Sequence, residues 1–315
     1  MASPKVPQEY LQPQAVKNRF ARNPWRHARE KIIEAVLFLA AFSAVAITLA
    51  IVAILIYESL AFFKHISILE FLTGTTWTPL FENAQYGILP LVAGTLVTSG
   101  VALLVAIPIG SIIAIYLSEF APHKVREVVK PFLELLASVP TVVYGYFALL
   151  VVTPLLQVLM PDLPGFNMLG PGIVIGIMIV PYVSSVSEDA MRAVPMSLRE
   201  GSYAMGATRF QTAVHVVTPA AISGIIAAYI LGMSRAIGET MVVAIAAGQQ
   251  PNFTWDPRES AATITAYIVQ VAMGDLPHGS IGYQSIFAAG LVLFLMTLAF
   301  NILGHMARKR FREVY

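Results

Sequence analysis

Long stretches without a charged residue constrain the fold of this chain more than any other feature. Four of them hold between 23 and 36 residues, at 35–57, 83–118, 135–161 and 163–187. Two more, at 210–234 and 276–307, contain no ionisable side chain other than histidine and tyrosine. A helix that crosses a bilayer needs about 20 mainly apolar residues, whereas a buried helix of a soluble protein shows about 10–14. The pattern therefore predicts an all-α membrane protein with six transmembrane helices.

We expect the six spans at 35–57, 88–117, 132–158, 171–186, 218–248 and 284–306. The fourth is short, so it is expected to begin inside the preceding loop. The fifth would be about 46 Å long as one helix, at 1.5 Å per residue. Because the hydrocarbon core is only about 30 Å thick, this span must tilt, protrude or break. The transmembrane domain then covers residues 35–307.

The basic residues predict the orientation of the chain. Of the 20 Lys and Arg, 17 fall in 1–34, 119–131, 187–217 and 308–315, and the opposite loops hold only Lys64 and Arg258. Basic loops stay in the cytoplasm, so both termini are expected there. Residues 1–34 are predicted to be a basic tail and an interfacial helix from about Pro24, since this stretch is too long for a cleavable signal peptide. Residues 308–315 form a second basic tail.

Composition excludes several classes of protein. The chain has no cysteine, a net charge of +2 and only 12% charged residues. Disulfide scaffolds, thiolate metal sites and cysteine nucleophiles are thereby excluded, and nucleic acid is not an expected partner. The sequence has no G-x-x-x-x-G-K-[ST], so a P-loop for ATP is absent, and its six histidines are scattered. We therefore expect no catalytic residue, no metal and no cofactor bound by this chain.

The cytoplasmic loop 187–217 is predicted to form two short helices. Ser197 and Glu200 fit a capping box that begins the first helix, Gly206 can end it, and Thr208 can cap the second. Tyr203 and Met205 would then be exposed unless something covered them. The loop is either a docking element for a cytoplasmic partner or a helix lying on the membrane surface.

Arg235 and Glu239 are charged residues inside the fifth span. A charged side chain at the centre of a membrane helix is costly and normally faces a bundle interior or a water-filled path. Their spacing of four predicts one shared helix face, which also carries small residues at Gly224, Ala228 and Gly232. The pair is either an ion pair that holds two helices together or a contact for a transported oxyanion, which guanidinium binds well. In the second case Glu239 keeps Arg235 oriented.

Ser138, Thr141 and Tyr144 recur at a spacing of three in the third predicted span. This spacing places three hydroxyls on one helix face, while Pro140 and Gly145 loosen the helix. The face is either a pathway lining or a kinked packing interface whose hydroxyls bond back to the backbone. Glu134, near the cytoplasmic surface, is expected to pair with Lys130.

Two motifs resemble a known family. The segment EGSYAMGATRFQTAVHVVTP is similar to the signature loop of ABC-importer permeases. Glu200, Gly206, Val216 and Pro219 fit that pattern, whereas Gly201 and Ser202 replace its usual alanines and Thr218 replaces a leucine. RAIGETM at 235–241 and SVPTVVYG at 138–145 resemble the phosphate-specific branch of the family, and its PstC-type subunit more than its PstA-type sister.

The resemblance implies the type I ABC-importer permease fold and an ATP-driven phosphate importer of the prokaryotic plasma (inner) membrane. Arg235 and Glu239 would lie on the phosphate path, with Ser138, Thr141 and Tyr144 as further candidates. A coupling segment, residues 200–206, would contact the ATP-hydrolysing subunits. It consists of Glu200, Gly201, Ser202, Tyr203, Ala204, Met205 and Gly206.

The same resemblance implies four kinds of partner. They are a homologous PstA-like permease, two PstB-like ATPases that use ATP and Mg²⁺, a PstS-like phosphate-binding protein and membrane lipid. Alternatives are the sister phosphate permease, a permease for molybdate or sulfate, a membrane scaffold or signalling subunit, and an ion channel. The lone basic residue in the membrane argues against a cation channel.

Overall fold

The structure is a computed structural model that describes residues 24–310 except 80, 82, 275 and 278. The described residues are mainly helical and contain no strand beyond two isolated bridges, as an all-α prediction requires. The predicted tail at 1–23 and residues 311–315 lie outside the described residues.

The α-helices are α1 (Pro24–Phe63), α2 (Ile68–Thr73), α3 (Leu89–Ile115), α4 (His123–Ser138), α5 (Thr141–Phe147), α6 (Thr153–Leu159), α7 (Leu169–Arg192), α8 (Met196–Ala204), α9 (Arg209–Thr212), α10 (Thr218–Ala220), α11 (Ile222–Ile237), α12 (Met241–Ala246), α13 (Ile264–Ala272) and α14 (Ile281–Arg310). Three π-helical segments join them, at η2 (Tyr116–Phe120), η3 (Ala148–Val152) and η4 (Ala213–Val217).

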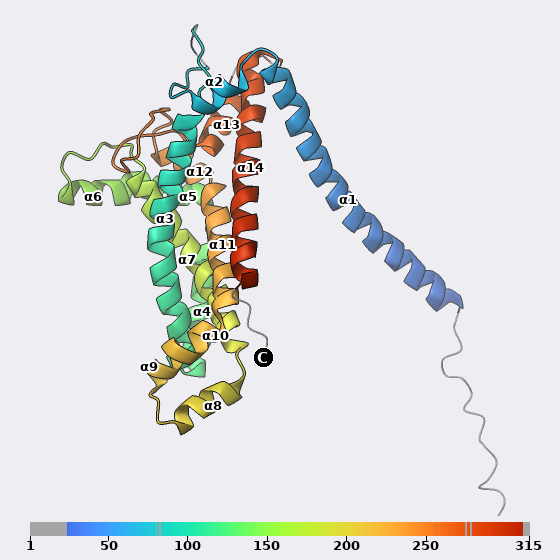
Figure 1. The fold of residues 1–315 in the computed structure, drawn as a ribbon, viewed down its shortest axis with the longest axis vertical. Helices are drawn as coiled ribbons and strands as arrows, with labels where there is room; N and C mark the ends of the chain where they lie inside the picture. The colour runs from blue at the N-terminus through green and yellow to red at the C-terminus, as the bar shows by residue number, and fades with distance from the viewer. Residues whose placement is uncertain (1–23, 80, 82, 275, 278, 311–315) are drawn as a thin grey trace, which may run out of the picture. The chain divides into compact units, whose positions relative to one another are not determined.

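The chain divides into two units, residues 1–54 and residues 55–315. In the described part of the first unit, α1 begins at Pro24 and runs on without a break, so the predicted interfacial helix is continuous with the first span. The second unit holds the rest of α1 and all other helices. Its two ends are named here by the helices they carry, the α2 end and the α8 end (Figure 1).

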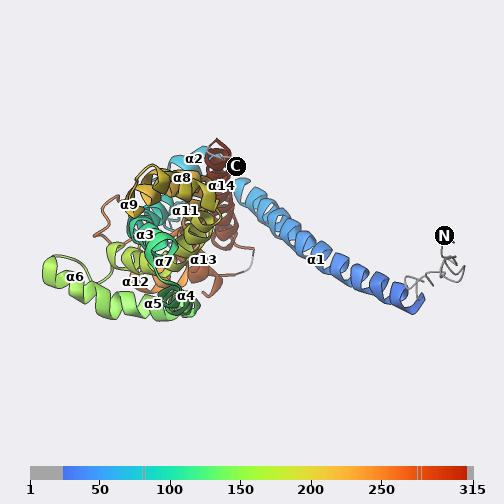
Figure 2. The same ribbon diagram turned by 90° about the horizontal axis from the view of Figure 1, so that it is seen from below.

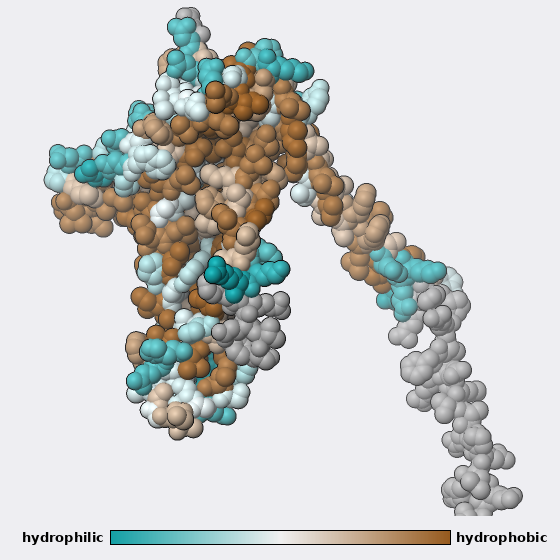
Figure 3. Space-filling model, viewed as in Figure 1, coloured by the Kyte–Doolittle hydropathy of each residue, from teal (hydrophilic) through white to brown (hydrophobic). Residues whose placement is uncertain are grey.

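Five of the described helical segments are long and apolar enough to cross a membrane, and a bent pair makes six. They are Ala28–Phe63, Leu89–Phe120, Thr141–Leu159, Leu169–Arg192 and Ile281–Arg310, with Arg209–Ala220 and Ile222–Ile237 as the bent pair. Apolar side chains cover the middle of the second unit and polar ones gather toward its ends (Figure 3). The number of predicted spans agrees with this count, and the chain is a multi-pass membrane protein.

For the third predicted span, 132–158, the predicted first residue is wrong. α4 ends at Ser138, and Val139 and Pro140 are extended before α5 begins at Thr141. The physical reason is Pro140, which lacks an amide proton and pushes the preceding residue out of the helical region. The span is therefore Thr141–Leu159, and its α6 end projects to one side of the bundle in two views (Figures 1 and 2).

The fifth predicted span, 218–248, breaks, which is one of the three outcomes that its length allows. The first bend, at Ala221, turns the chain by 73° between Arg209–Ala220 and Ile222–Ile237. A second break at 238–240 separates α11 from α12. The fourth span is longer than predicted, because α7 continues to Arg192 and includes Glu188 and Asp189.

α7 is the central helix of the second unit, and glycines allow its neighbours to approach closely. A Cβ atom at Gly176 would lie 2.8 Å from the Ala102 carbonyl oxygen of α3. On α11, a Cβ at Gly224 would lie 2.3 Å from the Ala190 Cβ of α7, and Gly232 faces Ile179 of the same helix. Small residues permit such close packing of membrane helices. The small residues around Arg235 therefore serve helix packing against α7.

The α2 end carries compact elements, which are built from residues 58–87 and from the described part of 249–283. Phe71 of α2 and Trp77 are at most 1% exposed and pack in edge-to-face contacts with Phe62 and with Tyr267 of α13. α13 is capped by Thr263, whose hydroxyl accepts from the Ala266 amide at 3.2 Å. Aromatic contacts thus pack these loop segments against the ends of the helices.

Candidate translocation and coupling sites

Arg235 lies in the last turn of α11 and is partly buried. Its guanidinium carbon stands 4.9 Å from the ring centroid of Tyr182 on α7, which is a cation–π contact. Its Nε atom is buried and has no hydrogen-bond partner among the described residues. The partial negative charge at the end of α11 favours a cation here. The site therefore holds a fixed positive charge with an unused hydrogen-bond donor, which is what an oxyanion requires.

Glu239 does not share a helix face with Arg235, because α11 ends at Ile237. This corrects the expectation from the spacing of four. Among the described residues the two side chains form no ion pair. Instead Glu239, 7% exposed, accepts a hydrogen bond from the Val242 amide of α12 at 3.4 Å. Its carbonyl oxygen accepts from the Thr265 hydroxyl of α13 at 2.7 Å. Glu239 thus joins α12 to α13 where the helix is broken.

The three hydroxyls of the third span do not lie on one helix face, because the break at Pro140 separates Ser138 from the other two. Tyr144 is buried and donates to the Leu136 carbonyl of α4 at 2.7 Å, across the break. The Ser138 hydroxyl donates to the Leu135 carbonyl at 2.8 Å. Both hydroxyls bond to the backbone, as the packing alternative expects, and Thr141 on α5 is the hydroxyl left for a pathway role.

The coupling segment lies on α8 and the turn after it, at one extreme of the second unit (Figure 1). Ser202 is partly buried, and its hydroxyl lies 2.9 Å from that of Thr212. The other six residues are exposed, with Met205 at 89%. Gly206 ends the turn with a φ of +85°, a conformation that glycine adopts without strain. An apolar tip on a rigid turn is suited to docking.

The capping box of this region is not where the sequence pattern placed it. α8 begins at Met196 after Pro195, and the Ser197 and Glu200 side chains make no cap. The reason is Pro195, which is favoured at a helix start because its missing amide proton is not needed there. A capping box forms instead at α9. The Thr208 hydroxyl accepts from the Gln211 amide at 3.3 Å and the Gln211 side chain accepts from the Thr208 amide at 2.8 Å.

Arg199 anchors α8 to the membrane helices, and sequence reasoning missed this residue. It is 8% exposed and donates to both carboxylate oxygens of Glu119, at 2.9 and 3.2 Å. It also donates to the carbonyls of Met191 at 2.9 Å and Val194 at 2.6 Å. Glu119 is the first charge after the uncharged stretch 83–118, so its presence at a membrane boundary was visible, but its partner was not.

A second ion cluster joins α4 to α7, and it too was missed. Glu188 of α7 is fully buried and forms ion pairs with Arg126 and Lys130 of α4. The Lys130 Nζ atom also lies 3.0 Å from an Asp189 carboxylate oxygen. The predicted pairing of Lys130 with Glu134 is therefore wrong. Burial lowers the pKa of Lys130, but hydrogen bonds to Asp189 and Glu188 outweigh it and hold that pKa above its ordinary value. The C-terminal end of α7 is thus joined to α4 by buried charged contacts.

The class of this protein follows from comparison of its sequence with known protein families. Residues 106–313 match the family described as the binding-protein-dependent transport system inner membrane component. The chain belongs to this family, whose members are permease subunits of ABC importers. It is therefore a permease subunit and not an enzyme, and its partners are a binding protein and ATPase subunits.

Relatives narrow the assignment within the family. The chain is 34% identical over 259 residues to the phosphate transport system permease protein PstC of Haemophilus influenzae, covering 75% of this chain and 80% of that protein. It is 38% identical over 238 residues to the probable ABC transporter permease protein YqgH of Bacillus subtilis, covering 76% of this chain and 77% of that protein. PstC 1 of Mycobacterium tuberculosis is 32% identical over 272 residues, covering 74% and 80%.

Solved structures agree on the fold. A bacterial ABC transporter involved in alginate import superposes with a TM-score of 0.63 at 19% identity, over 91% of this chain and 98% of that one. An inward-facing MetNI methionine ABC transporter superposes with a TM-score of 0.52 at 17% identity, over 72% of this chain and 94% of that one. The fold is that of type I ABC-importer permeases, as the sequence motifs implied.

Proposed function

We propose that this chain is the PstC-type permease subunit of an ATP-driven importer of inorganic phosphate and forms half of the translocation pathway. The observation that carries the proposal is Arg235, which is partly buried against the Tyr182 ring and has a buried Nε with no partner among the described residues. The relatives named PstC support phosphate as the oxyanion. Glu239, on the adjacent break, would limit how tightly the anion is held.

Transport then proceeds by alternating access. A PstA-like permease completes the pathway, PstB-like ATPases dock on the coupling segment, and a PstS-like protein delivers phosphate at the α2 end. Closure of the ATPase dimer moves α8. The Arg199–Glu119 pair transmits that movement to the end of the α3–η2 helix.

The orientation that this mechanism needs places the α8 end and both termini in the cytoplasm of a prokaryotic plasma membrane. Because the chain has no cysteine, single cysteines can be introduced without background. A cysteine at Met205 should react with a membrane-impermeant maleimide only after cells are opened. A cysteine at Trp255, in the loop 249–283, should react in intact spheroplasts. The reverse pattern would invert the topology and overturn the proposed mechanism.

Phosphate uptake tests the role of Arg235. Labelled phosphate is measured in cells that lack their own high-affinity system and carry this chain with its genomic-neighbour subunits. We expect Arg235→Gln to abolish most uptake and Arg235→Lys to retain part of it, because the charge remains while the planar donor set is lost. Arg310→Gln, an exposed arginine of α14, is the matched control and should transport normally.

The outcomes separate the alternatives when complex assembly and membrane abundance are equal. Full uptake by Arg235→Gln would remove Arg235 from the pathway and favour a structural role. Stronger competition by molybdate or sulfate than by phosphate would assign another oxyanion. Absence of uptake by the assembled wild-type complex would favour a scaffold or signalling subunit.

A further inference from the structure

α11 and α14 are held together along one part of their length and separate along another. The Ser234 hydroxyl donates to Asn301 at 3.3 Å, and one turn further a Cβ at Gly304 would lie only 2.4 Å from Ile230. Closer to the α8 end, a cavity of about 560 Å³ opens between the first turns of α11 and the last turns of α14. The two helices therefore form a wedge that is closed at Gly304 and open toward this end.

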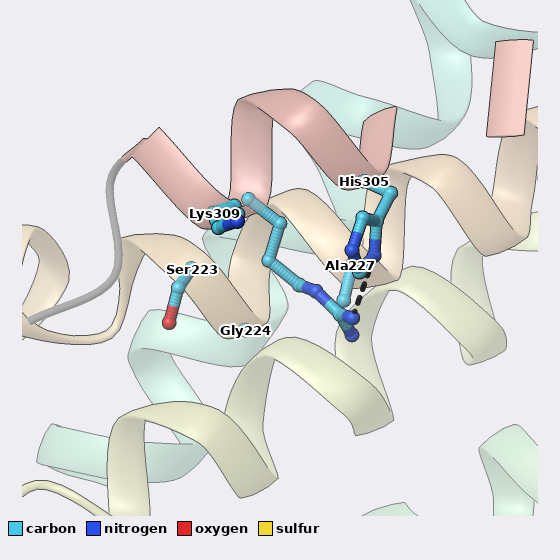
Figure 4. Close-up of a pocket in the computed structure, with 6 residues that line it drawn as sticks. Ser223, Gly224, Ala227, His305 and Lys309 are labelled. Carbon is cyan, nitrogen blue, oxygen red and sulfur yellow. Dashed lines mark hydrogen bonds between the residues drawn. The ribbon is translucent and has the colours of Figure 1, made fainter. Parts of the chain in front are cut away.

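The open part of the wedge is lined by small residues on one side and basic residues on the other (Figure 4). Ser223, Gly224 and Ala227 belong to α11, and His305, Arg308 and Lys309 belong to α14. Among the described residues, no carboxylate lines the cavity and no carboxylate forms an ion pair with Arg308 or Lys309.

Two features favour an anion in this cavity. Arg308 donates a hydrogen bond to the His305 Nδ1 atom at 3.0 Å, which orients its guanidinium. The beginning of α11, at Ile222, adds the partial positive charge of a helix start on the facing side. Guanidinium and ammonium groups that converge in this way match the oxygens of a phosphate group.

We propose that this cavity binds a phosphate group, either the headgroup of an anionic phospholipid or free inorganic phosphate. Basic pockets between membrane helices on the cytoplasmic side are suited to such headgroups. Exposed Ile302, Leu303 and Met306 of α14 lie next to the lining residues, where acyl chains of a lipid would pack. The proposal does not require phosphate to be the transported substrate.

Native mass spectrometry of the assembled transporter tests this site. The complex is titrated with phosphatidylglycerol, with phosphatidylcholine and with inorganic phosphate. The main variant combines Arg308→Gln with Lys309→Gln, and its matched control combines Lys124→Gln with Arg209→Gln, which removes the same charge from exposed positions at the α8 end. A third variant, Ala227→Leu, fills the wedge and leaves every charge in place.

We expect the double variant to weaken binding of the anionic ligand by about tenfold or more, since each basic residue near a membrane surface contributes to headgroup attraction. Ala227→Leu should also weaken it, and the control should not. Loss confined to phosphatidylglycerol identifies a lipid site, and loss confined to inorganic phosphate identifies a soluble-anion site. Equal loss in the control, unchanged binding in both cavity variants, or no preference for either anion over phosphatidylcholine would overturn the proposal.

Discussion

Arg199 of α8 and Glu119 of η2 form a two-point ion pair across 80 residues of sequence, with side chains only 10% and 6% exposed. The same guanidinium binds two carbonyls near the end of α7. Arg199 directly precedes the coupling segment, so if a subunit docks on α8 as proposed, a force applied there would reach two long helices through one side chain. This geometry gives α8 a rigid connection to the bundle.

Breaking this pair should uncouple ATP hydrolysis from transport. We expect Arg199→Met to lower phosphate uptake per ATP hydrolysed and to destabilise the protein by about 3 kcal/mol, because it leaves a buried carboxylate unpaired. Removing both charges with Glu119→Gln should restore part of the stability but not the coupling. Uptake and hydrolysis are measured together in proteoliposomes. Arg209→Met, an exposed arginine on α9, is the control, and an equal loss there would contradict a specific role for the pair.

The Tyr182 ring should position Arg235 through its π-face and not through its hydroxyl. We expect Tyr182→Phe to keep most of the uptake, because the cation–π contact is preserved. Tyr182→Leu should lower uptake several-fold, since such contacts contribute about 1 kcal/mol. Initial rates of labelled phosphate uptake check this order. Equal rates for the two variants would show that the ring does not position Arg235.

The contribution of Lys130 to stability should disappear at high pH. Its pKa in the folded protein lies above the ordinary 10.5, so its ion pairs stabilise the fold fully below pH 10.5 and are lost as the pH rises through the folded value. We expect the difference in unfolding temperature between wild type and Lys130→Met to stay constant at neutral pH and to be lost as the pH rises through the raised pKa of Lys130, above 10.5. Lys124→Met, which is exposed, should show no such change. A difference that grows with pH would contradict the assignment.

Two glycines of the coupling segment should respond in opposite directions to alanine. Gly206 has a φ of +85° with open space around its Cα, so Gly206→Ala should cost about 1 kcal/mol through backbone strain alone. Gly201 lies inside α8 with nothing within 4 Å of an added Cβ, so Gly201→Ala should stabilise the helix by up to about 1 kcal/mol. Thermal unfolding and co-purification with the ATPase subunits measure the two effects. Stabilisation by Gly206→Ala would contradict the left-handed turn.

The sequence located the local features of the candidate sites well where one residue type decides the structure. Gly206 ends its helix and Thr208 caps the next because both effects depend on nearest neighbours. The predicted cap at Ser197 is wrong, because the helix already begins at Met196, directly after Pro195. Arg235 was found because an arginine inside an apolar stretch is rare, but its partner, Tyr182, lies on another helix and left no local signal.

The sequence by itself determined that six apolar segments cross a membrane, because the length of an uncharged run is matched directly against the thickness of a bilayer. It also determined the family, through motifs that local spacing preserves. Only the tertiary structure decided that the helix breaks between Ile237 and Met241, separating Glu239 from Arg235, and that Arg199 pairs with Glu119. The physical reason is that a helix break inside a bundle and the choice of a charged partner depend on which helices pack together. That choice is made between residues far apart in the chain.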